Sequence, residues 1–201
     1  MFKKILHSIF SHPWAYNQLQ NFFGANKRKR AVQHQLRTMP QDAWILDLGG
    51  GTGLYRDIWP KDCRYICLDN DLIKLKGFSQ NGTSDYLLLA DATRVPIKNN
   101  SIDIILCNSM SHHLPQEVLE GLLKESGRIL KDAGQLFFLD AVLRRESLLN
   151  RFLWSLDRGE YPHTQQTLSS LIKRCFIINY LENFSHFYDF VLFVCTKTGT
   201  K

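Results

Sequence analysis

The sequence lacks the features that would assign it to a specialised class of protein. Its five cysteines are odd in number, and no CxxC pair or paired histidine cluster accompanies them, so we expect reduced thiols and no metal site. Glycine (12) and proline (6) occur at ordinary frequency without a repeat, which excludes fibrous and solenoid classes. The longest apolar stretches fall well short of the ~20 residues of a membrane-spanning helix. The 201 residues are therefore interpreted as one folded, cytoplasmic domain.

Acidic side chains are absent from the first forty residues. This segment holds seven Lys or Arg residues, whereas the remainder has 18 basic and 19 acidic residues and a net charge of −1. We expect a basic helical cap over residues 1–40. Long-range attraction to RNA or to an anionic membrane is an alternative role for this segment. Polar residues and Pro13 interrupt its apolar positions, so we interpret it as mature sequence rather than a signal peptide.

Short apolar runs alternate with helical patterns along the rest of the chain. Such alternation is typical of a doubly wound α/β fold with a parallel sheet. A helix is expected directly after Gly53, and another from Pro115 to the pair Ala133 and Gly134. Residues 143–176 have a helical pattern with a turn at 157–159, and the last two runs are expected to pair as a hairpin. The expected strands are 43–48, 64–69, 86–90, 102–107, 135–142, 177–184 and 190–196.

A glycine-rich turn follows the first expected strand. It reads Asp47-Leu48-Gly49-Gly50-Gly51-Thr52-Gly53 and lies where ligands bind in such sheets, at the carboxyl end of a strand. Glycine lets the backbone turn tightly and approach a ligand closely. Asp69 ends the second strand 20 residues after Gly49, the spacing at which an acidic side chain accepts hydrogen bonds from ribose hydroxyls. The pattern predicts a nucleoside-containing ligand.

Two common nucleotide motifs are missing from this region. The dinucleotide fingerprint requires Gly or Ala at position 54, where this chain has Leu54, so a nicotinamide oxidoreductase is disfavoured. The chain also has no G-x-x-x-x-G-K-[ST] sequence, which disfavours ATP hydrolysis.

The combined motifs resemble the class I S-adenosylmethionine-dependent methyltransferases, in particular the type 11 group. The resemblance covers about residues 43–142 and rests on segments 47–53, 65–70, 90–92, 94–97, 101–105, 112–114 and 128–136. It implies a seven-stranded, mostly parallel Rossmann-like sheet with an antiparallel C-terminal strand and an N-terminal helical cap. It also implies S-adenosyl-L-methionine as cofactor and S-adenosyl-L-homocysteine as product.

The resemblance assigns roles to individual residues. Asp47 would lie near the ammonium of the methionine part, bordered by the glycine backbone, while Asp69 would hold the ribose. Asp91 and the Ala92 N–H would contact the adenine. The implied cofactor-binding residues are Asp47, Gly49, Gly50, Gly51, Gly53, Asp69, Asn70, Asp91, Ala92 and Asn108.

Methyl transfer needs a base only when the acceptor must lose a proton. The histidines after the fourth strand are candidates because imidazole titrates near neutral pH. We expect His112 first, with Asn108 and His113 as further candidates for catalysis, and His163 and Tyr161 as lesser ones; Asp140 is assigned either a structural or a catalytic role. Each of these residues also has a structural explanation, such as packing or capping.

The acceptor is less well determined by the sequence. The chain has Asn108-Ser109-Met110-Ser111 where adenine-N6 enzymes carry N/D-P-P-Y, and it has no Pro-Cys pair, so two nucleic-acid chemistries are disfavoured. Residues 143–175 are expected to form lid helices over the acceptor, and residues 176–197 a terminal strand pair. Aromatic and basic residues in the lid and cap favour a small polar or acidic acceptor, such as a sugar or lipid-linked metabolite, and we expect methylation of an O or N of this acceptor. A non-catalytic cofactor-binding module that acts through its basic arm is the alternative.

Overall fold

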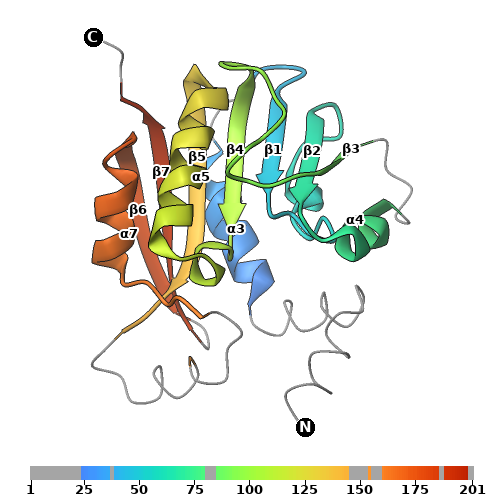
Figure 1. The fold of residues 1–201 in the computed structure, drawn as a ribbon. Helices are drawn as coiled ribbons and strands as arrows, with labels where there is room; N and C mark the ends of the chain where they lie inside the picture. The colour runs from blue at the N-terminus through green and yellow to red at the C-terminus, as the bar shows by residue number, and fades with distance from the viewer. Residues whose placement is uncertain are drawn as a thin grey trace, which may run out of the picture.

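The computed structural model describes residues 24–36, 39–79, 85–144, 154, 160–185 and 188–198. Their core is a seven-stranded sheet in the order β3-β2-β1-β4-β5-β7-β6 (Figure 1). The strands are β1 (Trp44–Leu48), β2 (Arg64–Asp69), β3 (Tyr86–Leu89), β4 (Ile102–Asn108), β5 (Leu130–Val142), β6 (Phe176–Ser185) and β7 (Asp189–Lys197). Neighbouring strands from β3 to β5 are parallel, and β7 is antiparallel to both β5 and β6. The expected fold class is therefore confirmed.

Helices cover both faces of the sheet. Helices α5 (Gln116–Ile129) and α7 (Gln165–Ile172) pack on one face, and α3 (Ala25–Gln35) and α4 (Leu72–Ser79) on the other (Figure 1). Residues alternate between the faces along each central strand, as a strand buried on both sides requires. Leu46 and Leu48, for example, join the core under α5, whereas Ile45 joins the core under α3.

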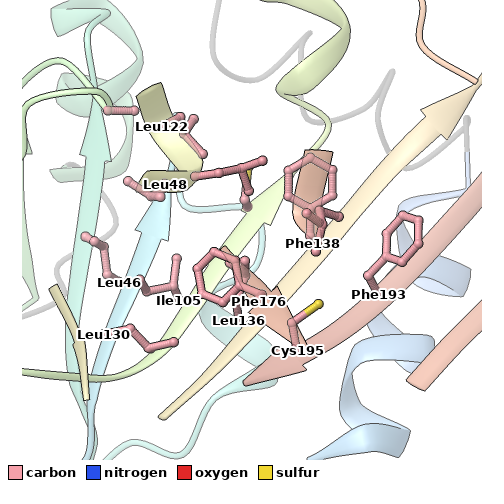
Figure 2. Close-up of a cluster of buried hydrophobic side chains, with 14 of the residues drawn as sticks. Leu46, Leu48, Ile105, Leu122, Leu130, Leu136, Phe138, Phe176, Phe193 and Cys195 are labelled. Carbon is pink, nitrogen blue, oxygen red and sulfur yellow. The ribbon is translucent and has the colours of Figure 1, made fainter. Parts of the chain in front are cut away.

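The core under α5 and α7 is built from aliphatic and aromatic side chains (Figure 2). Leu122 of α5 and Phe176 at the start of β6 belong to the same cluster of buried side chains. Within it, the rings of Phe138 and Phe193 pack at a centroid distance of 6.4 Å. These contacts fix β4 and β5 relative to β1, so the ends of the three strands are held in register at one edge of the sheet.

The helix expected after Gly53 does not form. Residues 54–59 make successive turns, of which only Arg56–Ile58 is a 3₁₀ helix, with bonds from Arg56 N–H to Gly53 O and from Trp59 N–H to Arg56 O. Pro60 explains the short length, because a proline disfavours helical backbone in the residue before it, and Trp59 is extended. The prediction of a helix directly after Gly53 is therefore wrong.

The helix that begins near Pro115 ends earlier than expected. The backbone is extended from Leu130 onward, so Ala133 and Gly134 belong to β5. The last helical carbonyls, those of Arg128 and Ile129, accept hydrogen bonds from the N–H groups of residues 100 and 101. These bonds from a separate segment satisfy the end of the helix without the glycine cap that the sequence suggested.

Several expectations fall outside the described residues. They concern the apolar positions before residue 24, the turn at 157–159 and all of the expected lid except 143–144, 154 and 160–175. Within the described part of the chain, no helix is long and apolar enough to cross a membrane. The terminal hairpin is confirmed, as β6 and β7 pair from Phe176 opposite Lys197 to Ser185 opposite Asp189.

Candidate active site

The glycine-rich turn leaves the carboxyl end of β1 with three left-handed residues. Gly49, Gly51 and Gly53 have φ values of +70°, +55° and +71°, a region that side chains with a Cβ rarely adopt. The turn is anchored to the neighbouring strand, because the Gly50 N–H donates to the Leu68 carbonyl at 3.0 Å. A Cβ at Gly50 would lie 2.7 Å from the Cys67 sulfur, so this position also requires glycine for space. The sequence motif therefore corresponds to a real constraint on the backbone.

Asp47 lies beneath this turn and is almost completely buried, with 2% of its surface exposed. The Tyr65 hydroxyl donates a hydrogen bond to its Oδ2. Burial raises the pKa of Asp47 to about 7, although the bond from Tyr65 lowers it, and nearby Asp69 raises it further. A positive charge placed beside this carboxyl would favour its ionised form.

Asp69 ends β2 directly beside the glycine turn. Its Oδ2 would be 3.5 Å from a Cβ on Gly51, which places the carboxylate against the turn. Its Oδ1 accepts the N–H of Asp71 at 2.8 Å, which holds the side chain in one orientation. Asn70 follows on the exposed side. The sequence spacing thus corresponds to spatial proximity, while the contact to a ribose stays a prediction.

Asp91 and Ala92 lie in the loop after β3. Asp91 is exposed, and its Oδ1 accepts hydrogen bonds from the Thr93 N–H at 2.7 Å and the Thr93 hydroxyl at 2.8 Å. These two bonds lower the pKa of Asp91, so it is ionised at neutral pH. Ala92 is buried against the core. Both residues follow a strand parallel to β2, so the loop starts at the same edge of the sheet as Asp69.

Asn108 ends β4, where a residue from the basic segment joins the site. The buried Arg28 of α3 donates from Nη1 to the Ser109 hydroxyl at 2.8 Å, and that hydroxyl bonds to Asn108 Oδ1 at 3.3 Å. The Arg28 guanidinium also lies 5.0 Å from the centre of the Phe190 ring. Sequence reasoning missed this contact because the pairing of Arg28 with Ser109 spans 81 positions.

His112 and Asp140 form a close ionisable pair at this edge. His112 Nδ1 lies 2.6 Å from Asp140 Oδ1, and Asp140 is only 1% exposed. Burial alone would raise the pKa of Asp140, but the facing His112 and the bonds from Ser111 outweigh it and lower the pKa. Neighbouring His113 is exposed, and its ring lies tilted at 46° against that of His112 with centroids 4.2 Å apart. Sequence reasoning named Asp140 without finding its partner.

The remaining acid–base candidates contact the same loop through other groups. The Tyr161 backbone N–H donates to the His112 carbonyl at 3.0 Å, while the Tyr161 side chain is exposed. His163 is buried, and its Nε2 lies 3.3 Å from the Leu114 carbonyl. Trp154 packs edge-on against His112 at 5.7 Å. Of these, Trp154 brings a side chain of the expected lid onto the His112 ring.

Comparison with known proteins agrees with this geometry. Residues 46–138 match the family model described as a methyltransferase domain. The chain is 28% identical over 128 residues to the malonyl-(acyl-carrier protein) O-methyltransferase of Hamiltonella defensa subsp. Acyrthosiphon pisum. The matched region covers 63% of this chain and 48% of that protein. The chain spans about half the length of the curated relatives it matches.

Solved structures share the whole architecture at low sequence identity. One contains the Haloferax volcanii Trm112 methyltransferase activator in complex with a methyltransferase; it matches with a TM-score of 0.78 and 13% identity, over 96% of this chain and 98% of the matched one. The geranyl diphosphate C-methyltransferase of Streptomyces coelicolor A3(2) was solved with S-adenosyl-L-homocysteine. It matches with a TM-score of 0.73 and 10% identity, over 87% of this chain and 81% of that one.

A sheet of this order, with a glycine turn after β1 and an acidic residue ending β2, defines the class I S-adenosylmethionine-dependent methyltransferase fold. Residues 46–138 match the methyltransferase-domain family model, which supports the type 11 group of this class. The resemblance inferred from the motifs is thereby confirmed, including the class of cofactor.

Proposed function

We propose that this protein transfers the methyl group of S-adenosyl-L-methionine to an O or N of a small acceptor. The observation that carries the proposal is the meeting of Asp69 with the glycine turn, where the carboxylate lies 3.5 Å from the position of a Gly51 Cβ. A close backbone approach and an acidic acceptor of hydroxyl bonds are the two features that a nucleoside ligand requires at the end of a parallel strand.

The residues at this edge suit the separate parts of the cofactor. Asp47 would offset the positive charge of the ammonium in the methionine part, and the backbone of Gly49 to Gly53 would border that part. Asp69 and Asn70 would bind the ribose. Asp91 and the Ala92 N–H would contact the adenine, and Asn108 would lie near the reacting methyl. When bound, the cofactor supplies an activated sulfonium, so the protein's task is to align acceptor and methyl and to exclude water.

A small acceptor is favoured by the surroundings of His112. The ring packs against Trp154, an aromatic residue of the expected lid, and the Tyr161 backbone N–H is hydrogen-bonded to the same loop. The relatives include one O-methyltransferase and two thiol S-methyltransferases, and one structural neighbour is a C-methyltransferase. A sugar or lipid-linked hydroxyl metabolite is the acceptor class we propose.

The basic arm provides weaker support for the alternative of a module that binds RNA or an anionic membrane. Three of the four cations at positions 27–30 contact this same domain: Lys27 Nζ donates to the Ser185 carbonyl, Lys29 pairs with Asp57, and Arg28 is buried. These contacts favour a structural role for this run of charges over a free basic surface.

Transfer of a labelled methyl group tests the proposed function. The full chain would be incubated with methyl-labelled S-adenosyl-L-methionine and either an ultrafiltered small-molecule extract, total RNA or anionic vesicles. The proposal expects label in the small-molecule fraction, lost in Asp69→Ala and retained in the exposed control Asp62→Ala. Label confined to RNA or to the lipid of the vesicles, or equal transfer by Asp69→Ala, would contradict the proposal.

A further inference from the structure

Asp140 collects hydrogen bonds from the whole turn that carries His112. Its Oδ2 accepts the Met110 N–H at 3.0 Å and both the N–H and the hydroxyl of Ser111 at 2.6 Å. Its Oδ1 accepts the Ala141 N–H at 2.7 Å and faces His112 Nδ1 at 2.6 Å. A buried carboxylate with this many donors, and with a lowered pKa, is ionised and can only accept.

The ionised Asp140 determines the tautomer of His112. Since the carboxylate has no proton to give, the bond between Asp140 Oδ1 and His112 Nδ1 requires the proton on Nδ1. The lone pair of the neutral ring is then on Nε2. The same arrangement of a carboxylate behind an imidazole keeps the distal nitrogen basic and stabilises the imidazolium that forms when it takes a proton.

The turn that carries His112 packs next to the glycine turn through Met110. The Met110 sulfur would lie 2.9 Å from a Cβ on Gly49, so the turn after β4 packs directly on the cofactor-binding segment. Trp154, from the expected lid, packs against His112 with ring centroids 5.7 Å apart. The Tyr161 N–H donates a hydrogen bond to the His112 carbonyl. The ring is therefore fixed by Asp140 at one nitrogen, by Trp154 at its edge and by Tyr161 at its backbone.

We propose that His112 is the general base of methyl transfer, with Asp140 as its positioning residue, and that the acceptor is a neutral hydroxyl rather than a carboxylate. This inference rests on the proposed function. In the step, the acceptor oxygen forms a bond to the methyl carbon while the carbon–sulfur bond breaks and its electron pair goes to sulfur. The hydroxyl proton passes to His112 Nε2, leaving methyl ether, S-adenosyl-L-homocysteine and an imidazolium paired with Asp140.

The His112–Asp140 pair would accelerate methylation of a hydroxyl but not of a carboxylate. A carboxylate is already ionised at neutral pH and needs no base, so a buried His–Asp pair would add nothing to its methylation. A hydroxyl has its proton at neutral pH, and removing it in the transition state contributes about 10²- to 10⁴-fold to the rate. The pair is thus useful to an acceptor that must lose a proton, such as a hydroxyl, and adds nothing for a carboxylate.

Methyl transfer to two probes of similar size, phenol and benzoate, tests the proposal. We expect transfer to phenol to fall about 100-fold or more in His112→Gln and about tenfold or more in Asp140→Asn, with no change in the exposed control His34→Gln. In His112→Gln the remaining rate should rise about tenfold per pH unit, because only ionised phenol then reacts, whereas the unaltered protein should level off. Equal transfer to benzoate, or an unchanged rate in His112→Gln, would overturn the proposal.

A second measurement does not depend on any acceptor. Nitrogen-15 shifts of histidine-labelled full-length protein, saturated with S-adenosyl-L-homocysteine, report which ring nitrogen carries the proton. The proposal expects His112 protonated on Nδ1 at pH 8, and a loss of this preference in Asp140→Asn. A proton on Nε2 would overturn the proposal, whether or not the probes react.

Binding of S-adenosyl-L-homocysteine to His112→Gln separates a failure of this inference from a failure of the proposed function. Intact binding of S-adenosyl-L-homocysteine, together with a transfer rate that does not depend on His112, would contradict only this inference. No binding even to the unaltered protein would contradict the proposed function.

Discussion

The Tyr65 hydroxyl donates a hydrogen bond to Asp47 Oδ2 directly beneath the glycine turn. Both side chains are buried, and they come from the neighbouring parallel strands β1 and β2. Burial raises the pKa of Asp47 to about 7 despite the bond from Tyr65. Asp47, which we propose as a cofactor-binding residue, is thus near the midpoint of its titration at neutral pH.

This raised pKa predicts a specific pH dependence of stability. The folded pKa of about 7 is above the ordinary value of 3.8 for an aspartate, so the folded state binds the proton more tightly than the unfolded state. The stabilising contribution of protonated Asp47 is complete below about pH 4 and is lost as the pH rises through 7. Asp47→Asn cannot ionise, so its unfolding free energy relative to the unaltered protein should increase by roughly 2–3 kcal/mol from pH 5 to pH 8.

Urea denaturation of both proteins at several pH values measures this difference, with the exposed Asp62→Asn as control. A difference between Asp47→Asn and the unaltered protein that stays constant with pH would show that Asp47 is ionised throughout the range.

Two glycine substitutions should have opposite effects on stability. At Gly53, alanine would combine a φ of +71° with a Cβ only 2.3 Å from the Phe78 ring, and we expect a loss of about 2–4 kcal/mol. At Gly121 in α5, the new Cβ would be 3.6 Å from Thr93, an ordinary contact, and alanine should stabilise the helix by about 0.5–1 kcal/mol. Thermal unfolding of the two variants checks the pair, and equal effects would contradict the account of the turn.

Arg128 of α5 should control the loop that carries Asp91 and Ala92. Its guanidinium donates to the carbonyls of Val95 and Ile97, both at 2.9 Å, which ties the loop to the helix. In Arg128→Ala we expect faster amide exchange in residues 91–97 and a three- to tenfold weaker affinity for S-adenosyl-L-homocysteine, roughly 1 kcal/mol. Arg174→Ala removes only an exposed ion pair with Glu120 and is the matched control. Unchanged exchange in Arg128→Ala would show that other contacts hold the loop.

Local patterns were sufficient to predict the sheet and the cofactor edge. Strands such as β1 and β2 are short apolar runs that end in glycine or aspartate, and parallel strands place those ends together without further information. The proximity of Asp69 to Gly51 followed from the spacing alone. These features depend on residues that are near in sequence or related by a regular strand geometry.

The missed features depend on contacts between distant segments. The early end of α5 results from bonds to residues 100 and 101, which no helical pattern can reveal. The pairing of His112 with Asp140 spans 28 positions, and that of Arg28 with Ser109 spans 81. The absent helix after Gly53 could have been predicted from Pro60, because the segment between them is too short for an amphipathic helix.

Isothermal titration of the full chain with S-adenosyl-L-homocysteine tests the central claim most directly. The account predicts micromolar binding to the unaltered protein, at least tenfold weaker binding to Asp69→Ala because the ribose loses its acceptor, and unchanged binding to the exposed control Asp62→Ala. No binding to the unaltered protein, or equal binding to Asp69→Ala, would contradict the assignment of this edge of the sheet as the cofactor site.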